Sequence, residues 1–597
     1  MALVECSTYD EYLELKPLLR NNILSSFNFK LTSNGIISNR TDINHYDIFP
    51  SSLGPLLETT NTQELHLRFT QGFWDHEIWG RLPFDGFKSG GTGVEVWANM
   101  NGDTKDEVYQ NWIILANSLS AFFCASLNFI DSSTTTFPRS CFSSNSTIDI
   151  NNNNNNNTSY LLRSALPREP VCTENLTPFL KLLPTRGKAG ISSLLDGHKV
   201  FDAEWNSMSI DIIKRMKEDQ TLIYEMDIKI NLVVNIPKKL SKNINQIPKP
   251  IPGEELRCDP TKKSDIYHCF PLDEPVNYEW DLETLFGKDI NGGIYISERQ
   301  SRVCMANVDE NYWKISGIKK KNDDLTFLEP KVLTDSYGTC FELEDAAYNY
   351  DIKFETSDST KLPPMEPIPI TVSRSLTGYS QDSGGFRTIF QNPSSTETEL
   401  IYFETMPWYM RVYLHTMELT IVNNINKTKN VYHIINSEFD EKNKVIKNVY
   451  YKPEKDRSKP SHLELTLMIP ADSTVTITYQ FDKSLLLYAE YPPDANHGFD
   501  IDPAVVTVLD ESRKEVYQLR TTSLLLTLPT PDFSMPYNVI ILTSTIMTLI
   551  FGALFNMLIK RVLSVEEYDE IVGQSSIISK LKTRIQLFKK KLTGKTD

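Results

Sequence analysis

The sequence predicts a mainly β membrane protein: two β-sandwich-like domains with a few helices, then one C-terminal transmembrane helix and a short basic tail. Three observations predict this fold class. Apolar and polar residues alternate along many short segments, as they do in strands with one buried face. A single long apolar run lies close to the C-terminus. The residues after this run are rich in lysine and arginine.

The composition describes a folded protein of several domains. The chain has 597 residues, of which 40% are hydrophobic and 23% charged, and its formal net charge is −16. Two or more domains of ordinary size fit this length. A protein that binds nucleic acid would normally carry a basic patch or domain, so the acidic balance argues against nucleic acid as a partner.

Alternating strands occur in both halves of the chain. The clearest are Glu64–Trp74, Arg411–Val422, Leu463–Ile469 and Ser473–Phe481. The turn residues Pro470–Asp472 between the last two predict a hairpin. Strands with one wet face, joined by turns, are typical of antiparallel β-sandwiches.

Changes in composition divide the chain into segments. The best helical candidates are Lys105–Ile130 and Asn206–Lys217, and the Asn/Ser-rich stretch 143–159 predicts a disordered loop. Pro-rich stretches at 241–255 and 357–370 indicate boundaries. We therefore expect a β-rich lumenal domain at 1–240, a linking region at 241–365, a second lumenal β-sandwich at 366–528, a juxtamembrane segment at 529–538, a transmembrane helix at 539–559 and a cytosolic tail at 560–597.

The apolar run Val539–Ile559 has 21 residues and no charge. As a helix it would cover about 30 Å, the thickness of a bilayer core. A buried core helix is the alternative, but soluble core helices are rarely so long and so apolar. Lys560 and Arg561 follow at once, whereas no lysine or arginine lies between Arg520 and the run. The positive-inside rule then places the tail in the cytosol and residues 1–538 in the lumen.

This orientation requires a signal that carries the chain across the membrane. Residues 1–24 contain no apolar stretch of the kind found in signal peptides. We favour the interpretation that the signal peptide is missing from this sequence. The alternative is a tail-anchored protein with its bulk in the cytosol. Beyond the run, residues 575–592 predict a basic amphipathic helix, which would lie either on an anionic leaflet or free in solvent.

The cysteines and glycosylation sequons favour an oxidising, lumenal compartment. The eight cysteines form no C-x-x-C pair, which argues against a zinc ribbon or a thioredoxin-like site. Sequons begin at Asn39, Asn145, Asn156, Asn157, Asn175 and Asn426, and we expect glycans on Asn39, Asn145, Asn157, Asn175 and Asn426. One cysteine, Cys172, lies within Pro167–Phe179, where the prolines predict an exposed loop.

Catalytic and metal-binding motifs are weak. The fragments Asp382–Gly385 and His268-Cys269 resemble parts of trypsin-like proteases, but the surrounding residues do not fit, and we expect a Gly-rich hairpin turn at 382–385. The histidines are dispersed, and no phosphate-binding loop, dinucleotide fingerprint or set of metal ligands occurs. The sequence therefore predicts a binding or structural subunit that is not an enzyme and needs no cofactor or metal.

Several longer stretches together resemble the GPI transamidase component PIG-T family. They are LHLRFTQGFW (65–74), FCASLNFIDS (123–132), LPREPVCTENLTP (166–178), MPWYMRVYLHT (406–416), DANHGFDI (494–501) and LPTPDFSMPYNVI (528–540). The resemblance implies a non-catalytic, single-pass type I subunit of a complex in the endoplasmic reticulum membrane that attaches GPI lipids to proteins. A single-span glycoprotein of the receptor or adhesion type is the alternative function.

The resemblance also implies roles for individual residues. Cys172 corresponds to the cysteine that forms a disulfide with the caspase-like catalytic subunit, although an intrachain pair remains the alternative. If Cys172 is used in this way, another thiol stays free, and Cys124 suits a buried one. Cys258–Cys269 and Cys304–Cys340 are possible intrachain pairs.

A second predicted site concerns the GPI lipid. Asp532, Ser534 and Asn538 lie just before or at the start of the apolar run, where a carboxylate and two polar groups suit sugar hydroxyls and ethanolamine amines. The resemblance adds Asn496. An ordinary interfacial linker anchored by Phe533 and Tyr537 is the alternative. The expected partners are thus the catalytic subunit, the other membrane subunits of the complex, the GPI lipid and the membrane.

Overall fold

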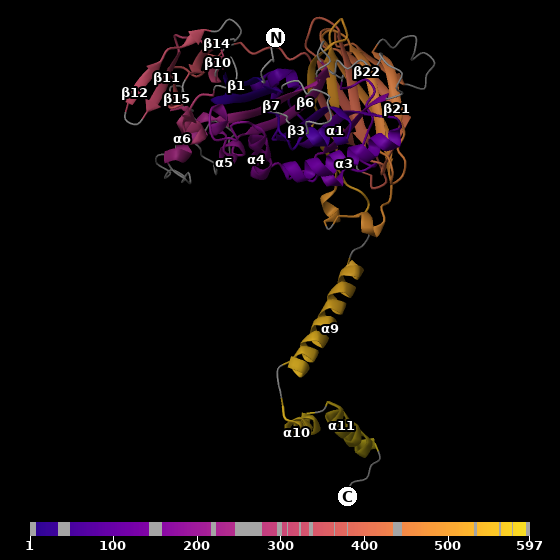
Figure 1. The fold of residues 1–597 in the computed structure, drawn as a ribbon. Helices are drawn as coiled ribbons and strands as arrows, with labels where there is room; N and C mark the ends of the chain where they lie inside the picture. Colours follow the sequence, from indigo (N-terminus) through magenta and orange to yellow (C-terminus); the bar gives the residue numbers. More distant parts are fainter. Residues whose placement is uncertain are drawn as a thin grey trace, which may run out of the picture. The chain divides into compact units, whose positions relative to one another are not determined.

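The structure is a computed structural model. It describes residues 8–33, 48–142, 158–216, 222–244, 278–294, 301–306, 308–321, 324–332, 338–344, 346–362, 364–378, 380–433, 445–492, 494–530, 534–559, 563–575 and 577–592. The chain forms two compact units, Met1–Pro529 and Thr530–Asp597. The described strands all belong to the first unit, whereas α9, α10 and α11 form the second (Figure 1). The mainly β fold class with one apolar C-terminal helix is confirmed.

A ten-stranded sheet forms the centre of the first unit. Its order is β13-β14-β10-β1-β2-β7-β6-β3-β4-β5, and every neighbouring pair is antiparallel except β1 and β10. The bounds are β1 (Thr8–Leu18), β2 (Asn22–Thr32), β3 (Thr62–Gln71), β4 (Gly93–Gly102), β5 (Thr158–Leu166), β6 (Trp205–Met216), β7 (Leu222–Asn235), β10 (Ser301–Ala306), β13 (Lys331–Val332) and β14 (Gly338–Leu343). The helix predicted at 206–217 is wrong, because this segment is β6. β6 pairs with β3 on one edge and with β7 on the other, so successive side chains point to opposite faces of the sheet, with a period of two residues.

Helices cover one face of this sheet (Figure 1). They are α1 (Gly54–Thr59), α3 (Lys105–Phe123), α4 (Thr173–Leu182), α5 (Gly197–Val200) and α6 (Ile236–Ile244). The helix predicted from Lys105 is confirmed as α3, and Thr104 caps it by accepting a hydrogen bond from Glu107 N–H at 3.2 Å. It ends at Phe123 rather than at Ile130, because Cys124 adopts a left-handed conformation with φ +52°. The short 3₁₀ helix η2 (Leu127–Phe129) follows.

The expected linking region at 241–365 is not separate from the first domain. Its strands β10, β13 and β14 extend the ten-stranded sheet. A second sheet of β8 (Tyr278–Asp281), β9 (Ile290–Asn291), β11 (Trp313–Lys321), β12 (Asp324–Leu328) and β15 (Asn349–Thr356) shares the same core. Cys304 and Cys340 lie opposite each other on β10 and β14 and are joined, which confirms that predicted disulfide. Cys258 and Cys269 lie outside the described residues.

Two facing five-stranded sheets form a β-sandwich from β16 to β26, and the predicted domain bounds 366–528 stay a prediction. One sheet has the order β16-β17-β23-β19-β20 and the other β21-β22-β18-β25-β26. The bounds are β16 (Thr371–Thr377), β17 (Ser383–Asn392), β18 (Thr398–Met406), β19 (Met410–Asn423), β20 (Lys429–His433), β21 (Ile446–Lys452), β22 (Ser461–Ile469), β23 (Ser473–Lys483), β25 (Val505–Leu509) and β26 (Glu515–Arg520). β24 (Phe499–Ile501) and β27 (Leu524–Leu526) pair beside them.

Two local predictions in the sandwich are wrong. β22 and β23 do not form a hairpin, because the Pro470–Asp472 turn carries the chain from one sheet to the other. Leu465 of β22 and Ile477 of β23 therefore enter the same core from opposite sides. The glycines at 384 and 385 are not in a turn either, since they belong to the first residues of β17, with Ser383 opposite Asp482.

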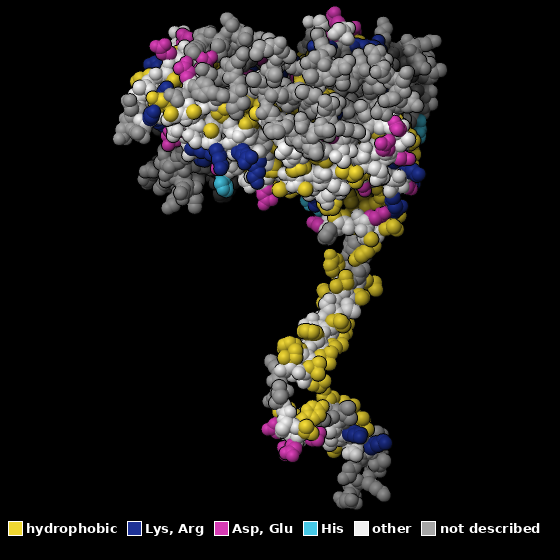
Figure 2. All heavy atoms as spheres, in the orientation of Figure 1, with side chains coloured by type: hydrophobic (Ala, Val, Ile, Leu, Met, Phe, Trp, Pro, Cys, Tyr) yellow, Lys and Arg dark blue, Asp and Glu magenta, His cyan; other side chains and the backbone are white. Residues whose placement is uncertain are grey.

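The second unit holds the candidate membrane span. Helix α9 (Ser534–Ile559) contains the apolar stretch Tyr537–Ile559, with a mean hydropathy of 2.0. Figure 2 shows hydrophobic side chains along most of the visible face of α9. The basic helix predicted at 575–592 corresponds to α11 (Ile577–Leu592), and a further helix that we did not predict, α10 (Val565–Ser575), precedes it.

Candidate functional site

Cys172 is exposed at the start of a helix rather than in a loop. The predicted loop at 167–179 is therefore wrong beyond Cys172, because α4 begins at Thr173 and continues past Pro178. The backbone N–H of Cys172 donates to Asn175 Oδ1 at 2.7 Å, and the N–H of Asn175 donates to the carbonyl of Cys172 at 3.0 Å. These two bonds form a reciprocal cap, which fixes the backbone of Cys172 while its thiol faces solvent.

Asn175 joins the beginning of α4 to the end of α3. Its Nδ2 donates to the carbonyls of Phe123 at 2.9 Å and Cys124 at 3.2 Å, and the residue is 1% exposed. A glycan would have to be attached to this same buried nitrogen. The placement argues against the predicted glycan at Asn175. A sequon carries no information on burial. The spacing Cys-x-x-Asn before an apolar helix could, however, have indicated the cap between Cys172 and Asn175.

Cys124 lies next to this junction and is exposed, so the prediction of a buried thiol is wrong. The left-handed turn at Cys124 ends α3, with Phe123 in the core. Among the cysteines that the structure describes, the buried free thiol is that of Cys141, which is 2% exposed and lies 3.4 Å from Thr507 Oγ1. Burial raises the pKa of the Cys141 thiol to about 12, so this thiol stays protonated and unreactive.

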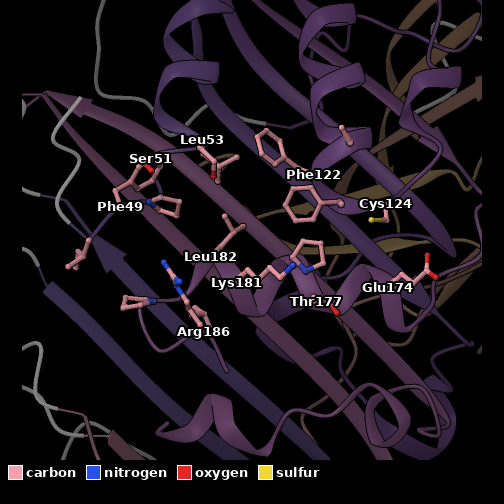
Figure 3. Close-up of a pocket in the computed structure, with 18 residues that line it drawn as sticks. Phe49, Ser51, Leu53, Phe122, Cys124, Glu174, Thr177, Lys181, Leu182 and Arg186 are labelled. Atoms are coloured by element: carbon pink, nitrogen blue, oxygen red, sulfur yellow. The ribbon is translucent and has the colours of Figure 1, made fainter. Parts of the chain in front are cut away.

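A pocket of about 810 Å³ lies beside the junction of α3 and α4 (Figure 3). The segment 48–53, the end of α3 and one side of α4 form its walls. From α4 come Glu174, Thr177 and Lys181, and Phe122 and Cys124 line it from the end of α3. Cys124 lines this pocket, whereas Cys172 does not line it and precedes the lining residue Glu174 by two positions in the chain.

The residues predicted to contact lipid are not brought together in one unit. Asn496 is exposed in the 3₁₀ helix η5 (Ala495–His497) of the first unit. In the second unit Ser534 begins α9, and Asn538 is exposed in its early turns. Asp532 lies outside the described residues. Within the first unit, the hydroxyl of Tyr491 donates to the carbonyl of Pro529, so the segment that contains Asn496 starts beside the last residue of that unit.

The remaining predicted glycosylation sites are only partly described. Asn426 is exposed in the turn between β19 and β20, where its backbone N–H donates to Asn423 Oδ1 at 3.0 Å. Asn39, Asn145 and Asn157 lie outside the described residues. Glycans at these four positions stay predictions.

One acidic cluster in the described part of the chain has the spacing of metal ligands. It consists of Glu283, Asp289 and Asp351. Lys320 Nζ lies 3.4 Å, 3.1 Å and 3.4 Å from their respective carboxylates. The ammonium group of Lys320 thus already pairs with all three carboxyl groups, and we assign no metal to the cluster.

These features define a class of protein: a mainly β protein with one candidate C-terminal membrane span and an exposed cysteine at the edge of a large pocket. A family model described as the Gpi16 subunit, a GPI transamidase component, matches residues 1–586. The chain therefore belongs to the Gpi16 family of GPI transamidase components, and the predicted resemblance is confirmed.

The relatives agree over nearly the whole length. The chain is 47% identical to GPI transamidase component GPI16 of Saccharomyces cerevisiae, over 99% of this chain and 94% of that protein. It is 34% identical to the GPI transamidase component PIG-T homolog of Schizosaccharomyces pombe, over 97% and 94%. The human GPI-anchor transamidase component PIGT is 29% identical, over 93% and 91%.

Proposed function

We propose that the chain is a non-catalytic scaffold subunit of GPI transamidase in the endoplasmic reticulum membrane. The large unit lies in the lumen, α9 spans the membrane once, and the basic tail is cytosolic. The scaffold holds a caspase-like catalytic subunit through a disulfide at Cys172 and helps to position the GPI lipid. The observation that carries the proposal is the exposed thiol of Cys172 at the capped start of α4, a helix whose Glu174, Thr177 and Lys181 line a pocket of about 810 Å³.

The physical advantage of such a disulfide is high effective concentration. Once the two chains are joined, rebinding of their surfaces becomes intramolecular, at effective concentrations in the mM range for short connections. Two thiols lose two protons and two electrons to the oxidants of the lumen when the bond forms. Because the cap fixes the backbone at Cys172, the partner would be held at a defined place on the scaffold.

The chain offers a matched control for this proposal. Cys124 and Cys172 are both exposed, and both lie against Asn175, so they experience similar surroundings. Each is changed to serine in the full-length chain, expressed in cells with the catalytic subunit. In non-reducing gels we expect a reducible heterodimer in the wild type and in Cys124→Ser, and none in Cys172→Ser. A heterodimer that persists in Cys172→Ser would contradict the proposal.

The lipid part of the proposal concerns Asp532, Ser534, Asn538 and Asn496. In the sequence Asp532 comes just before α9 and Ser534 and Asn538 lie at its start, whereas Asn496 lies in η5 of the first unit. A carboxylate and amide groups in this region suit the amines and hydroxyls of a GPI headgroup. We expect Asp532→Ala to reduce GPI attachment in cells while the complex still co-purifies, and Asp569→Ala in α10 to have no effect. Normal attachment in Asp532→Ala would count against the lipid contact.

A receptor or adhesion-type ectodomain was the alternative. A collagen-binding domain from a Staphylococcus aureus adhesin is 7% identical to this chain and covers 26% of it, with a TM-score of 0.18. A similarity this low carries no argument for adhesion. Co-purification of the full-length chain with a caspase-like subunit would favour the scaffold, whereas isolation without any other transamidase subunit would favour the alternative.

A further inference from the structure

A small lobe of the first unit exposes large apolar side chains. This apolar lobe consists of residues 484–492 and 494–501, with η4 (Tyr488–Glu490), and of β27, which pairs with β24. The exposed fractions are 73% for Leu485, 61% for Leu487, 55% for Tyr488 and 49% for Leu525. Figure 1 shows the lobe as an orange extension of the sandwich, and hydrophobic side chains are visible on it in Figure 2. Exposed groups of apolar side chains mark contact surfaces.

The exposure comes from a backbone that its neighbours hold in place. Leu487 N–H donates to Glu490 Oε2 at 2.6 Å, and the carboxylate of Glu490 is paired with Arg457. Leu486 packs against the core of the sandwich. Because neighbouring side chains of an extended chain point in opposite directions, Leu485 and Leu487 point away from this core.

The chain leaves the first unit at this lobe. The hydroxyl of Tyr491 donates to the carbonyl of Pro529, which is the last residue of the first unit. In the sequence the apolar stretch of α9 begins at Tyr537, eight residues after Pro529. The lobe is thus the part of the first unit from which the chain continues into the candidate membrane span.

The far end of the sandwich offers a matched position for comparison. The lobe starts beside the beginning of β19, because Ser484 N–H donates to the carbonyl of Tyr409 at 2.8 Å. Ile425 is 70% exposed just beyond the other end of β19, where its N–H donates to Asn423 Oδ1 at 3.0 Å. The 14 residues of β19 separate the two ends by about 40 Å at the usual rise of a strand. Exposure is therefore similar at both ends, and the exit of the chain distinguishes the lobe.

We infer that the apolar lobe docks on the lumenal surface of the phospholipid bilayer. Leu485, Leu487 and Leu525 enter the outer part of the acyl chains, and Tyr488 lies at the level of the headgroups. Leucine side chains gain free energy when they leave water, and tyrosine favours the boundary between lipid and water. The bilayer is the occupant that the course of the chain favours, because the chain passes from this lobe into the span. The inference rests on the proposed span and orientation, but not on Cys172 or on recognition of the GPI lipid.

Docking would give the first unit a second attachment to the membrane besides the chain itself. Two attachments restrict the tilt of the lumenal part more than one does. Partner subunits would then meet a scaffold at a constant height above the bilayer, which lowers the cost of ordering on assembly.

The test measures contact between the lobe and lipid tails in the full-length chain. The chain is reconstituted in phosphatidylcholine nanodiscs that contain no GPI lipid, with or without bromine on the acyl chains. Leu487→Trp places a fluorescent ring in the lobe, and Ile425→Trp is the matched control. Each adds its emission to that of the eight native tryptophans. Because bromine quenches tryptophan only near contact, we expect loss of most of the added emission for Leu487→Trp and no loss for Ile425→Trp.

A second position in the lobe guards against an effect of one substitution. Leu525→Trp on β27 should also lose most of its added emission in the brominated nanodiscs. The substituted side chains are exposed, so we expect equal thermal unfolding midpoints for the variants and the wild type. Quenching at Leu487→Trp without quenching at Leu525→Trp would contradict docking of the whole lobe.

Three results would overturn the inference. They are no quenching of Leu487→Trp, equal quenching of Leu487→Trp and Ile425→Trp, or quenching that disappears when the other transamidase subunits are bound. The last result would identify a protein as the occupant of the lobe. An intact Cys172 heterodimer without quenching would refute this inference alone, whereas quenching in a chain that forms no heterodimer would refute the scaffold role of Cys172 and leave the bilayer contact.

Discussion

At β3 both faces of the ten-stranded sheet are buried, but opposite kinds of side chain build them. On β3, Leu67 and Phe69 are fully buried and pack in the core shared with α3 and α4. On the same strand Glu64, His66 and Arg68 are between 2% and 8% exposed. We expected one wet face from the alternation of β3, and for this strand that expectation is wrong.

The polar face is buried because the sandwich covers part of it. Glu95 of β4 accepts from Arg163 Nε of β5 at 2.9 Å and from Arg520 Nε of β26 at 3.0 Å. Since Arg520 belongs to the sandwich, this carboxylate joins the two domains. The two faces therefore differ in how substitutions lower the free energy of unfolding. A truncated apolar side chain loses only its own buried contacts. A removed ionic partner also leaves other buried charges unpaired.

The largest effect should follow from the removal of Glu95. Glu95→Ala leaves Arg163 and Arg520 buried without their shared carboxylate, and we expect a loss of about 3–5 kcal/mol in the free energy of unfolding. The triple variant Glu95→Leu, Arg163→Met, Arg520→Met should recover most of this loss, because apolar groups of similar size need no partner. Urea unfolding followed by tryptophan fluorescence measures both. A triple variant less stable than Glu95→Ala would contradict this account.

The apolar face should respond differently. A substitution there should lower the free energy of unfolding, and further apolar substitutions should not restore it. Leu67→Ala should lower the free energy of unfolding by about 2–5 kcal/mol through lost burial and a cavity. The loss should be the same at low and high salt, because no charge is removed. Unfolding curves in both salt conditions would check this, and a marked salt dependence for Leu67→Ala would remove the contrast between the faces.

A smaller effect should come from His66 on the polar face, which should make the stability of the protein depend on pH. Burial acts to lower the pKa of His66, but its hydrogen bonds to Asp211 and Glu64 raise it above 6.5. His66 therefore stabilises the fold at low pH and loses this contribution as the pH rises through its folded pKa. We expect the thermal unfolding midpoint to fall from about pH 6 to pH 8, and less so in His66→Gln. An equal fall in both proteins would contradict this role of His66.

The pH dependence should reverse in acid. Burial acts to raise the pKa of Asp211, but Arg68 and Lys88 hold it well below 3.8. Its contribution is present above the unfolded pKa and disappears as the pH falls through the folded one. Asp211→Asn should therefore reduce stability at neutral pH and flatten the acid side of the profile. An unchanged acid limb in Asp211→Asn would show that other carboxylates cause it.

The smallest effect should follow from an ion pair on the outer surface. Arg411 and Asp456 lie 3.1 Å apart, but their side chains are 50% and 52% exposed. Arg411→Gln should change the free energy of unfolding by less than about 1 kcal/mol, because water screens the pair. The same urea unfolding assay measures it, and a loss as large as that of Glu95→Ala would show that burial does not separate the two kinds of ion pair.

Features that depend on local pattern could be predicted from the sequence. The period-2 strand at 64–74, the apolar helix at 539–559 and the start of α3 after its cap follow from residues near one another in the chain. Features that depend on partners distant in the chain could not be predicted from the sequence. The polar side chains of β3 find their partners far along the chain, as Arg68 does at Phe87 and Asp211. β22 and β23 separate because they pair with strands from different sheets.

The candidate site shows the same division. The motif at 166–178 identified Cys172 from the sequence, but the exposure of Cys124 and the burial of Asn175 depend on the meeting of α3 and α4. The cavity that Asp500 and Arg168 line, between the ten-stranded sheet and the sandwich, is formed by five separate parts of the chain: 126–134, 165–169, 405–409, Pro460 and 499–502. No pattern within one segment indicates that these charges converge.

The central claim is that Cys172 is paired with another chain. Mass spectrometry of the purified complex, digested without reduction, tests it most directly. We predict a linked peptide pair that joins Cys172 to the catalytic subunit, together with the internal pair Cys304–Cys340. Cys172 recovered as a free thiol, or linked to Cys124 of its own chain, would contradict the claim.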